Sequence, residues 1–207
     1  MSQLRSFIVV VVLAILAPHP ARADVPVVLV LGDSLSAAHA IPVEAGWVAL
    51  LDRRLSDSGR GRVVNASISG ETTAGGLARL PGLLADHTPG LLVLELGAND
   101  GLRGLPIAQI SDNLAAMIEL AQAAGAAVLL VGIELPINYG PRYRGALREV
   151  YAELAQRHGT GLVPFLLEDV ALAPGLMQDD GLHPTADAQP LLLETVWPAL
   201  QAQLAAP

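Results

Sequence analysis

Short runs of Val, Leu and Ile alternate along the chain with longer segments in which apolar residues recur at helical spacing. The short runs are typical of strands buried on both faces, as in a parallel sheet. They are Val27 to Leu31, Val63 to Ala66, Leu91 to Leu96, Ala127 to Ile133 and Gly161 to Phe165. The helical segments are Trp47 to Ser56, Ala74 to His87, Ile107 to Ala124, Tyr143 to His158 and about Thr185 to Leu204. This order predicts a three-layer α/β/α fold: a five-stranded parallel sheet with helices on both faces and right-handed crossovers.

The first residues have the pattern of an export signal. Arg5 precedes an apolar run from Phe7 to Ala17, prolines follow, and the small-residue motif at 21–23 is of the A-x-A type. The run is shorter than the ~20 residues that span a bilayer. We expect residues 1–23 to be a cleaved signal peptide and residues 24–207 to form a single domain. The location would then be the periplasm or the outside of the cell.

Composition excludes several classes of function. Residues 24–207 contain ten arginines, no lysine and 20 acidic residues, which gives a formal net charge of −10. An acidic domain without a basic run is a poor partner for nucleic acids or anionic membranes. The absence of cysteine excludes a thiolate nucleophile, a cysteine metal site and stabilisation by disulfides. We expect a monomer that is not inserted in a membrane.

Four polar segments follow predicted strands, and so should meet at one edge of the sheet. Loops that leave the carboxyl ends of parallel strands open on the same edge, where ligands bind. The segments are Gly32 to Ser36, Ser67 to Thr72, Gly97 to Gly101 and Asp179 to Pro184. Together they supply a hydroxyl, a glycine backbone, a side-chain amide and an Asp/His pair. A nucleophilic serine needs these groups: a base, an acid that orients the base, and donors for the oxyanion.

The base can be chosen by elimination. Of the four histidines after residue 23, His87 and His158 end helices and should lie on the opposite edge. His39 is on the correct edge, but it is only five residues beyond Ser34 and no acid is positioned behind it. His183 follows the last strand and precedes a helix, which returns it to the edge that carries Ser34. Asp180 lies three residues earlier, close enough for its carboxylate to reach the imidazole Nδ1. We therefore predict a Ser34–His183–Asp180 triad.

The individual motifs allow other interpretations. The Asp180–His183 segment could be a polar loop leading into a helix, or half of a metal site, although no HExxH motif and no second clustered histidine accompany it. Ser34 could cap a helix or bond to a loop backbone. No G-x-S-x-G occurs, so the strained elbow of α/β-hydrolases is absent. Without that elbow, Gly70 and Asn99 are the candidate oxyanion donors.

Three further acidic residues accompany the motifs. Asp33 and Asp100 flank the candidate site residues, and loop hydrogen bonds are their expected role. Glu95, within a predicted strand, should be a buried carboxylate with a partner that the sequence does not identify.

The four segments, in this order, resemble the four sequence blocks of the SGNH/GDSL hydrolase superfamily. Those blocks are G-D-S, a glycine, G-x-N-D and D-x-x-H, and all four match without substitution. Their flanks, and almost the whole chain after the signal, resemble the multifunctional bacterial thioesterase/lysophospholipase/arylesterase branch. The matching stretches are Gly32 to Ala37, Val64 to Gly70, Gly76 to Leu80, Asn99 to Gly104, Asn138 to Gly140 and Met177 to Pro184.

The resemblance implies a function and a site. Ser34 would be the nucleophile and the first oxyanion N–H, Gly70 the second donor, Asn99 the third, and Asp180 and His183 the rest of the triad. It also implies a flavodoxin-like strand order of 2-1-3-4-5 and hydrolysis of acyl esters, thioesters, aryl esters or lysophospholipids without a cofactor or metal. An acyl groove would be bordered by residues 101–106 and 135–140. We name Leu102, Leu105, Leu135 and Asn138 as its residues, with Ile137 beside them.

Two other functions stay open. One is a carbohydrate acetylesterase on the same scaffold. The other is an exported ligand-binding module that has lost the chemistry, against which the complete set of five site residues argues. The apolar loop residues favour longer acyl chains, because loops at a site are more often polar; they could also simply pack the loops onto the sheet.

Overall fold

The structure, a computed structural model, describes residues 26–205 and contains a five-stranded parallel sheet in the order β2-β1-β3-β4-β5. The strands are β1 (Val27–Gly32), β2 (Arg62–Asn65), β3 (Leu91–Glu95), β4 (Ala127–Val131) and β5 (Gly161–Val163). Every residue of β1 and β3 is buried. The predicted fold class and the strand order implied by the resemblance are confirmed. The predicted signal peptide lies outside the described residues.

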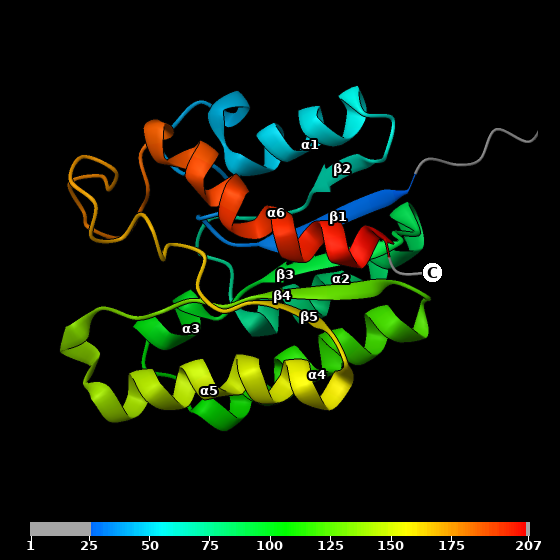
Figure 1. The fold of residues 1–207 in the computed structure, drawn as a ribbon. Helices are drawn as coiled ribbons and strands as arrows, with labels where there is room; N and C mark the ends of the chain where they lie inside the picture. The colour runs from blue at the N-terminus through cyan, green and yellow to red at the C-terminus, as the bar shows by residue number, and fades with distance from the viewer. Residues whose placement is uncertain (1–25, 206–207) are drawn as a thin grey trace, which may run out of the picture.

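Helices cover both faces of the sheet (Figure 1). One layer is formed by α1 (Trp47–Asp57) and α6 (Gln189–Ala205), which pack together over β2, β4 and β5. The other is formed by α2 (Thr73–His87), α4 (Ile107–Ala123) and α5 (Pro141–His158). A side chain ties the start of α1 to that of α6, because the Trp47 N–H donates to Oε1 of buried Gln189 at 2.9 Å.

The remaining elements are short. The 3₁₀ turns η1 (Val43–Ala45), η2 (Ile137–Tyr139) and η3 (Ala186–Ala188) lie in connections. The five-residue helix α3 (Ala98–Leu102) replaces what the sequence predicts as a loop. None of the helices within residues 26–205 has both the length and the apolar character required to cross a bilayer.

The last two strands end two residues earlier than predicted, where Pro164 interrupts the pairing between them. The predicted ends of β4 and β5 were Ile133 and Phe165, but the strands stop at Val131 and Val163. Pro164 has no N–H to continue the ladder. The chains stay joined across it, since the Gly132 N–H donates to the Val163 carbonyl and the Leu166 N–H donates to the Gly132 carbonyl. Beyond this point the segments that follow β4 and β5 continue as loops at the carboxyl edge of the sheet.

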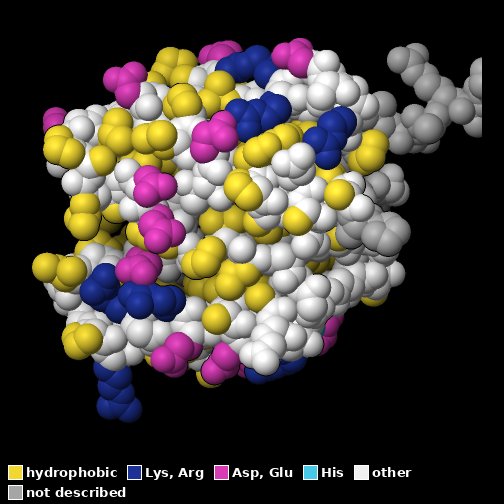
Figure 2. All heavy atoms as spheres, in the orientation of Figure 1, with side chains coloured by type: hydrophobic (Ala, Val, Ile, Leu, Met, Phe, Trp, Pro, Cys, Tyr) yellow, Lys and Arg dark blue, Asp and Glu magenta, His cyan; other side chains and the backbone are white. Residues whose placement is uncertain are grey.

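The outer face of α5 and α6 carries a mixture of side chains. Figure 2 shows acidic and apolar side chains interspersed on this face, with arginines in separate small groups. The carboxyl edge of the sheet, at the left of Figure 1, is where α3 and the long segment after β5 lie.

Candidate active site

A tight turn after β1 presents Ser34. The Asp33 carboxylate stabilises the turn, because Oδ1 accepts the Leu35 N–H at 3.0 Å and the Asp33 carbonyl accepts the Ala37 N–H at 2.9 Å. A side chain at Gly32 would not fit, since its Cβ would lie 2.7 Å from Glu95 Oε2. Only glycine therefore lets the chain leave β1 at this angle and bring the Ser34 hydroxyl to the edge of the sheet.

Asp180 and His183 lie on one loop whose two ends are joined. Met177 and Pro184 form an antiparallel bridge, and the Gln178 N–H donates to the His183 carbonyl at 2.8 Å. Within the loop, Asp180 Oδ1 accepts the N–H groups of Leu182 and His183 at 2.9 and 3.0 Å. The loop thus fixes the acid against the backbone of the residue that it has to orient.

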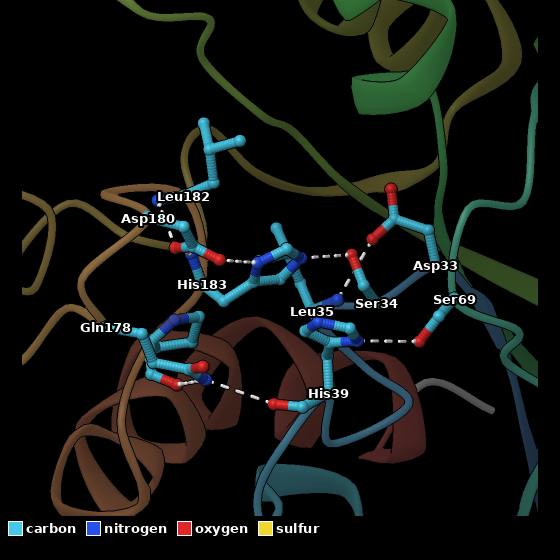
Figure 3. Close-up of polar contacts among 10 residues, drawn as sticks. Asp33, Ser34, Leu35, His39, Ser69, Gln178, Asp180, Leu182 and His183 are labelled. Carbon is cyan, nitrogen blue, oxygen red and sulfur yellow. Dashed lines mark hydrogen bonds and ion pairs between the residues drawn. The ribbon is translucent and has the colours of Figure 1, made fainter.

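Ser34, His183 and Asp180 form a continuous hydrogen-bonded line (Figure 3). Asp180 Oδ2 lies 2.7 Å from His183 Nδ1, and His183 Nε2 lies 2.9 Å from Ser34 Oγ. The hydrogen bond from the imidazole, aided by the two backbone N–H groups, lowers the pKa of Asp180 to about 2. An ionised Asp180 favours the tautomer with its proton on Nδ1, which leaves Nε2 free to accept the serine proton.

Asn99 is held in the first turn of α3 by bonds on either side of it. Its side-chain amide donates to Asp33 Oδ2 at 3.0 Å. Its neighbour Asp100 is fully buried and accepts both the N–H and the hydroxyl of Thr73, at 2.9 and 2.6 Å. An Asn side-chain amide has two N–H groups, so the bond to Asp33 leaves one N–H available to a ligand.

Gly70 lies in the loop between β2 and α2, with a φ of 82° that favours glycine. This loop is attached to the Ser34 turn by the Ile68 N–H, which donates to the Gly32 carbonyl at 3.1 Å. From the other side, Arg103 Nη2 donates to the Gly70 carbonyl at 3.2 Å. The structure therefore brings the loops of Ser34, Gly70, Asn99 and His183 to one edge, as the sequence predicts.

Two carboxyl groups are buried behind the nucleophile. Glu95 bonds to the turn that carries Ser34, a partner that the sequence does not reveal. Its Oε2 accepts the Ser36 hydroxyl at 2.7 Å and the Asp33 N–H at 3.3 Å. Burial raises the pKa of Asp33 to about 6, against the opposing effects of the Leu35 N–H, His183 and Asn99. Burial, and then the charge on Asp33, raise the pKa of Glu95 well above its usual range. Both carboxyl groups therefore keep their protons to a higher pH than an exposed Asp or Glu does, and each opposes ionisation of the other.

The serine opens on an apolar cavity of about 210 Å³. The polar residues that line it are Asp33, Ser34, Asn99, Glu134 and His183. Its apolar lining consists of Leu35, Ala98, Leu102, Ile133, Leu135, Pro136, Phe165, Leu166, Leu167 and Leu182. Concave apolar sites with a few convergent polar groups are the usual form of a small-molecule site.

Of the five predicted groove residues, only Leu102 and Leu135 line this cavity. Leu105 is held outside it, where its carbonyl accepts the Tyr143 hydroxyl at 2.6 Å. Ile137 is 83% exposed and borders an adjoining groove, which shares Pro136, Phe165 and Leu182 with the cavity. Asn138 is exposed on η2 and does not line the cavity.

Sequence reasoning missed Phe165, Leu167 and Leu182. The first two follow β5, beyond the point where Pro164 ends the strand, and could have been found by asking where that strand stops. Leu182 lies inside the D-x-x-H block itself.

The other histidines lie at the edges that the sequence predicts, and His39 also contacts the ring of His183. His87 and His158 end α2 and α5 at the far edge. His39 lies at the carboxyl edge, and its Nδ1 is 3.5 Å from Ser69 Oγ, while its ring packs on that of His183. Within residues 26–205, no three His, Cys, Asp or Glu side chains cluster closely enough to hold a metal ion.

A parallel α/β sheet that aligns a serine, a histidine and an aspartate at the mouth of an apolar cavity has the architecture of a serine hydrolase. The GDSL-like Lipase/Acylhydrolase family matches residues 30–190, and the chain belongs to this family. The four sequence blocks that carry the resemblance lie within or at the edge of the active site.

Curated relatives include Esterase TesA of Pseudomonas aeruginosa, 57% identical over 88% of this chain and 92% of that protein. An arylesterase of Vibrio mimicus is 50% identical over 81% of this chain and 84% of that protein. Thioesterase 1/protease 1/lysophospholipase L1 of Escherichia coli is 46% identical over 92% of this chain and 89% of that protein. A crystal structure of TesA is 58% identical and superposes with a TM-score of 0.83 over 86% of this chain and 99% of that one.

Proposed function

We propose that this ester hydrolase cleaves acyl esters and thioesters through Ser34, with His183 as base and Asp180 as the acid that orients it. The observation that carries the proposal is the unbroken line from Asp180 through His183 to Ser34, with its serine end in an apolar cavity. A nucleophile and a base within hydrogen-bond reach, with the base oriented by a third group, are the signature of an activated serine.

The reaction takes place in two steps. His183 Nε2 accepts the proton of Ser34 Oγ as that oxygen attacks the carbonyl carbon, and the carbonyl electron pair moves onto the oxygen. When the tetrahedral intermediate collapses, the bond to the leaving oxygen or sulfur breaks, and His183 returns the proton to the leaving group. Water then attacks the acyl-serine with the same base, which releases the acid and restores Ser34.

The developing oxyanion would be stabilised by the N–H groups of Ser34 and Gly70 and by the Asn99 amide. Such donors act most strongly when they are fixed before the reaction begins. The bond from Asn99 to Asp33 supplies that fixation, because the carboxylate holds one amide N–H and the other stays available to a substrate. Asp33 is thereby a positioning residue for Asn99.

The substrate class follows from the cavity and from the relatives. Leucines, an isoleucine and a phenylalanine dominate the lining, and each buried CH₂ contributes up to ~0.8 kcal/mol to binding. The relatives are named as an arylesterase and as a thioesterase and lysophospholipase. We therefore assign medium-chain and longer acyl groups on aryl, thiol or lysophospholipid leaving groups.

The test is a series of p-nitrophenyl esters from acetate upward, run beside acyl-CoA, lysophospholipid and acetylated sugars. We expect kcat/KM to rise with chain length until the cavity is filled, and turnover to disappear in Ser34→Ala. A profile that peaks at acetate, with efficient turnover of acetylated sugars, would instead identify a carbohydrate acetylesterase. Binding without turnover by the unsubstituted protein would identify a ligand-binding module.

We also propose that residues 1–23 are removed on export and that residues 24–207 function as a monomer. The export proposal rests on the short apolar run and on the small-residue cleavage motif that follows it. The mass of the exported protein should correspond to a chain that begins at Asp24, and light scattering should give the mass of one chain. Recovery of the uncleaved chain in a membrane fraction would contradict the export proposal.

A further inference from the structure

A second histidine covers one face of the imidazole of His183. The ring centroids of His39 and His183 lie 4.2 Å apart, with 36° between the planes (Figure 3). Aromatic pairs usually have centroids 4.5–7 Å apart, so this contact is close. His39 contacts neither Ser34 Oγ nor the carboxylate of Asp180 by a hydrogen bond. Its position suits a residue that acts on the base through the face of the ring.

The triad leaves the imidazole with one degree of freedom that a neighbouring ring can restrict. The bonds of His183 to Asp180 and Ser34 are made by its two ring nitrogens, and bonds at these two atoms resist rocking of the ring about the line between them only weakly. Asp180 also remains 43% exposed, and water weakens an exposed ion pair. A ring packed on the face of His183 opposes the motion that the two bonds leave free.

The chain holds His39 in this position from both sides. Ala38 and Ala40 have φ values of 58° and 56°, in the left-handed region, which is strained for an alanine. Gln178 Nε2 donates to the His39 carbonyl at 3.0 Å and to the Pro184 carbonyl at 2.9 Å. Gln178 thus ties the backbone of His39 to the loop that carries His183.

We propose that His39 is a positioning residue for the base: its ring keeps the imidazole of His183 in line with Ser34 and Asp180. The contact also fits the charge that develops, because the face of an aromatic ring attracts a cation such as the imidazolium formed when His183 accepts the proton. The proposal rests on the assignment of His183 as the base. It predicts that a flat apolar ring can replace His39, whereas removal of the ring slows the reaction.

The experiment compares His39→Ala and His39→Phe in the full chain with a medium-chain p-nitrophenyl ester. Loss of one stacking contact should lower kcat about threefold to tenfold in His39→Ala. KM should change little, because the ring does not line the cavity. His39→Phe should restore kcat, which a proton-transfer role of His39 could not explain. His87→Ala, at the far edge of the sheet, is the matched control.

A double-mutant cycle separates action through His183 from a general structural effect. In a His183→Ala background, His39→Ala should cause no further loss. The same fractional loss in both backgrounds, or unchanged kcat in His39→Ala alone, would overturn the proposal. A loss in His39→Ala as large as that in His183→Ala, without rescue by Phe, would make His39 a second proton-transfer group. Full activity of His183→Ala itself would instead refute the proposed function.

Discussion

At the scale of single residues, the proposed mechanism depends on two hydrogen bonds that meet on His183. In that mechanism neither bond activates Ser34 alone, because Asp180 sets the tautomer of the imidazole and Nε2 accepts the serine proton. Ser34→Ala and His183→Ala should therefore each lower kcat by about 10⁴–10⁶, and the double variant should fall little further. Steady-state kinetics on a p-nitrophenyl ester measures this, with thermal unfolding as the check that each variant is folded.

Asp180→Asn should also be severely impaired, because an amide at this position cannot hold the imidazole in the required tautomer. Additive losses in the double variant would mean that Ser34 and His183 act in separate steps. Activity that survives in His183→Ala and disappears only with His39→Ala would assign the base to His39.

The proposed oxyanion role of Asn99 has a separate kinetic signature. Asn99→Ala removes a donor that acts as charge develops on the carbonyl oxygen, so kcat should fall by ~10²–10³ while KM changes much less. Asn99→Asp, nearly isosteric, places a carboxylate opposite Asp33 and should be at least as damaging. An increase in KM with unchanged kcat would make Asn99 a binding residue.

The residue types and their order were enough to predict that the loops of Ser34, Gly70, Asn99 and His183 meet at one edge of the sheet, where the structure places them. They were not enough to show that Asp33 holds Asn99 or that Glu95 supports the Ser34 turn. Asp33 and Asn99 are separated by 66 positions in the sequence, and Ser36 and Glu95 by 59. Both contacts form because β1 and β3 are neighbours in the sheet. No local pattern records such a pairing, whereas a D-x-x-H contact spans only one turn of chain.

At the scale of elements, the structure differs from the sequence-based expectation where tertiary contacts outweigh local preference. Helix α3 contains Asn, Asp and Gly, which are poor helix formers. It forms because Gly97 takes a φ of 121° before it and because Asp100 bonds to Thr73 of α2. The strands, by contrast, are marked by continuous Val and Leu runs, and their positions were predictable to within two residues.

The elements around the cavity give a prediction about chain-length preference. Leu182 lines the cavity and is 36% exposed, so truncation should cost little stability. Leu182→Ala should lower kcat/KM for medium-chain esters by about tenfold and leave the acetate ester nearly unaffected, because only a longer chain reaches that wall. Leu191→Ala on α6, with 41% exposure, is the matched control. An equal loss on both esters would mean that Leu182 supports the triad loop rather than the acyl chain.

At the scale of the whole molecule, the buried acids make stability depend on pH. Asp33 has an ordinary pKa of 3.8 and a folded pKa of about 6, so the folded chain holds its proton over a range in which the unfolded chain has lost it. The free energy of unfolding must then fall as pH rises between these values. Glu95 acts in the same direction. Asp180 acts in the opposite sense, but only as pH falls from 3.8 toward 2.

Asp33→Asn removes the buried charge and keeps an acceptor for Leu35. It should raise the free energy of unfolding at pH 8 by up to about 3 kcal/mol and have a much smaller effect at pH 4.5. Urea unfolding at the two pH values measures the difference. An equal change at both would show that Asp33 does not titrate across this range. Lower activity in a more stable variant would indicate that the buried charge is retained for the sake of Asn99.

The global arrangement was predictable because parallel strands leave little freedom: every strand exit opens on one edge, and every helix returns the chain to the other. The order of the strands was not predictable from the pattern of apolar residues, and it came from the resemblance. Which loop side chains would face the cavity was also unpredictable, since Leu102 and Leu105 are equally apolar and only Leu102 faces inward.

The loop from Met177 to Pro184 carries acid and base together, and its ends are pinned to each other. The contact between Asp180 and His183 is therefore local, since it is made inside one loop. The contact between His183 Nε2 and Ser34 Oγ joins two loops that lie 149 positions apart in the sequence. The alignment of the base with the serine thus depends on how these two loops pack on the sheet, whereas the alignment of the acid with the base does not.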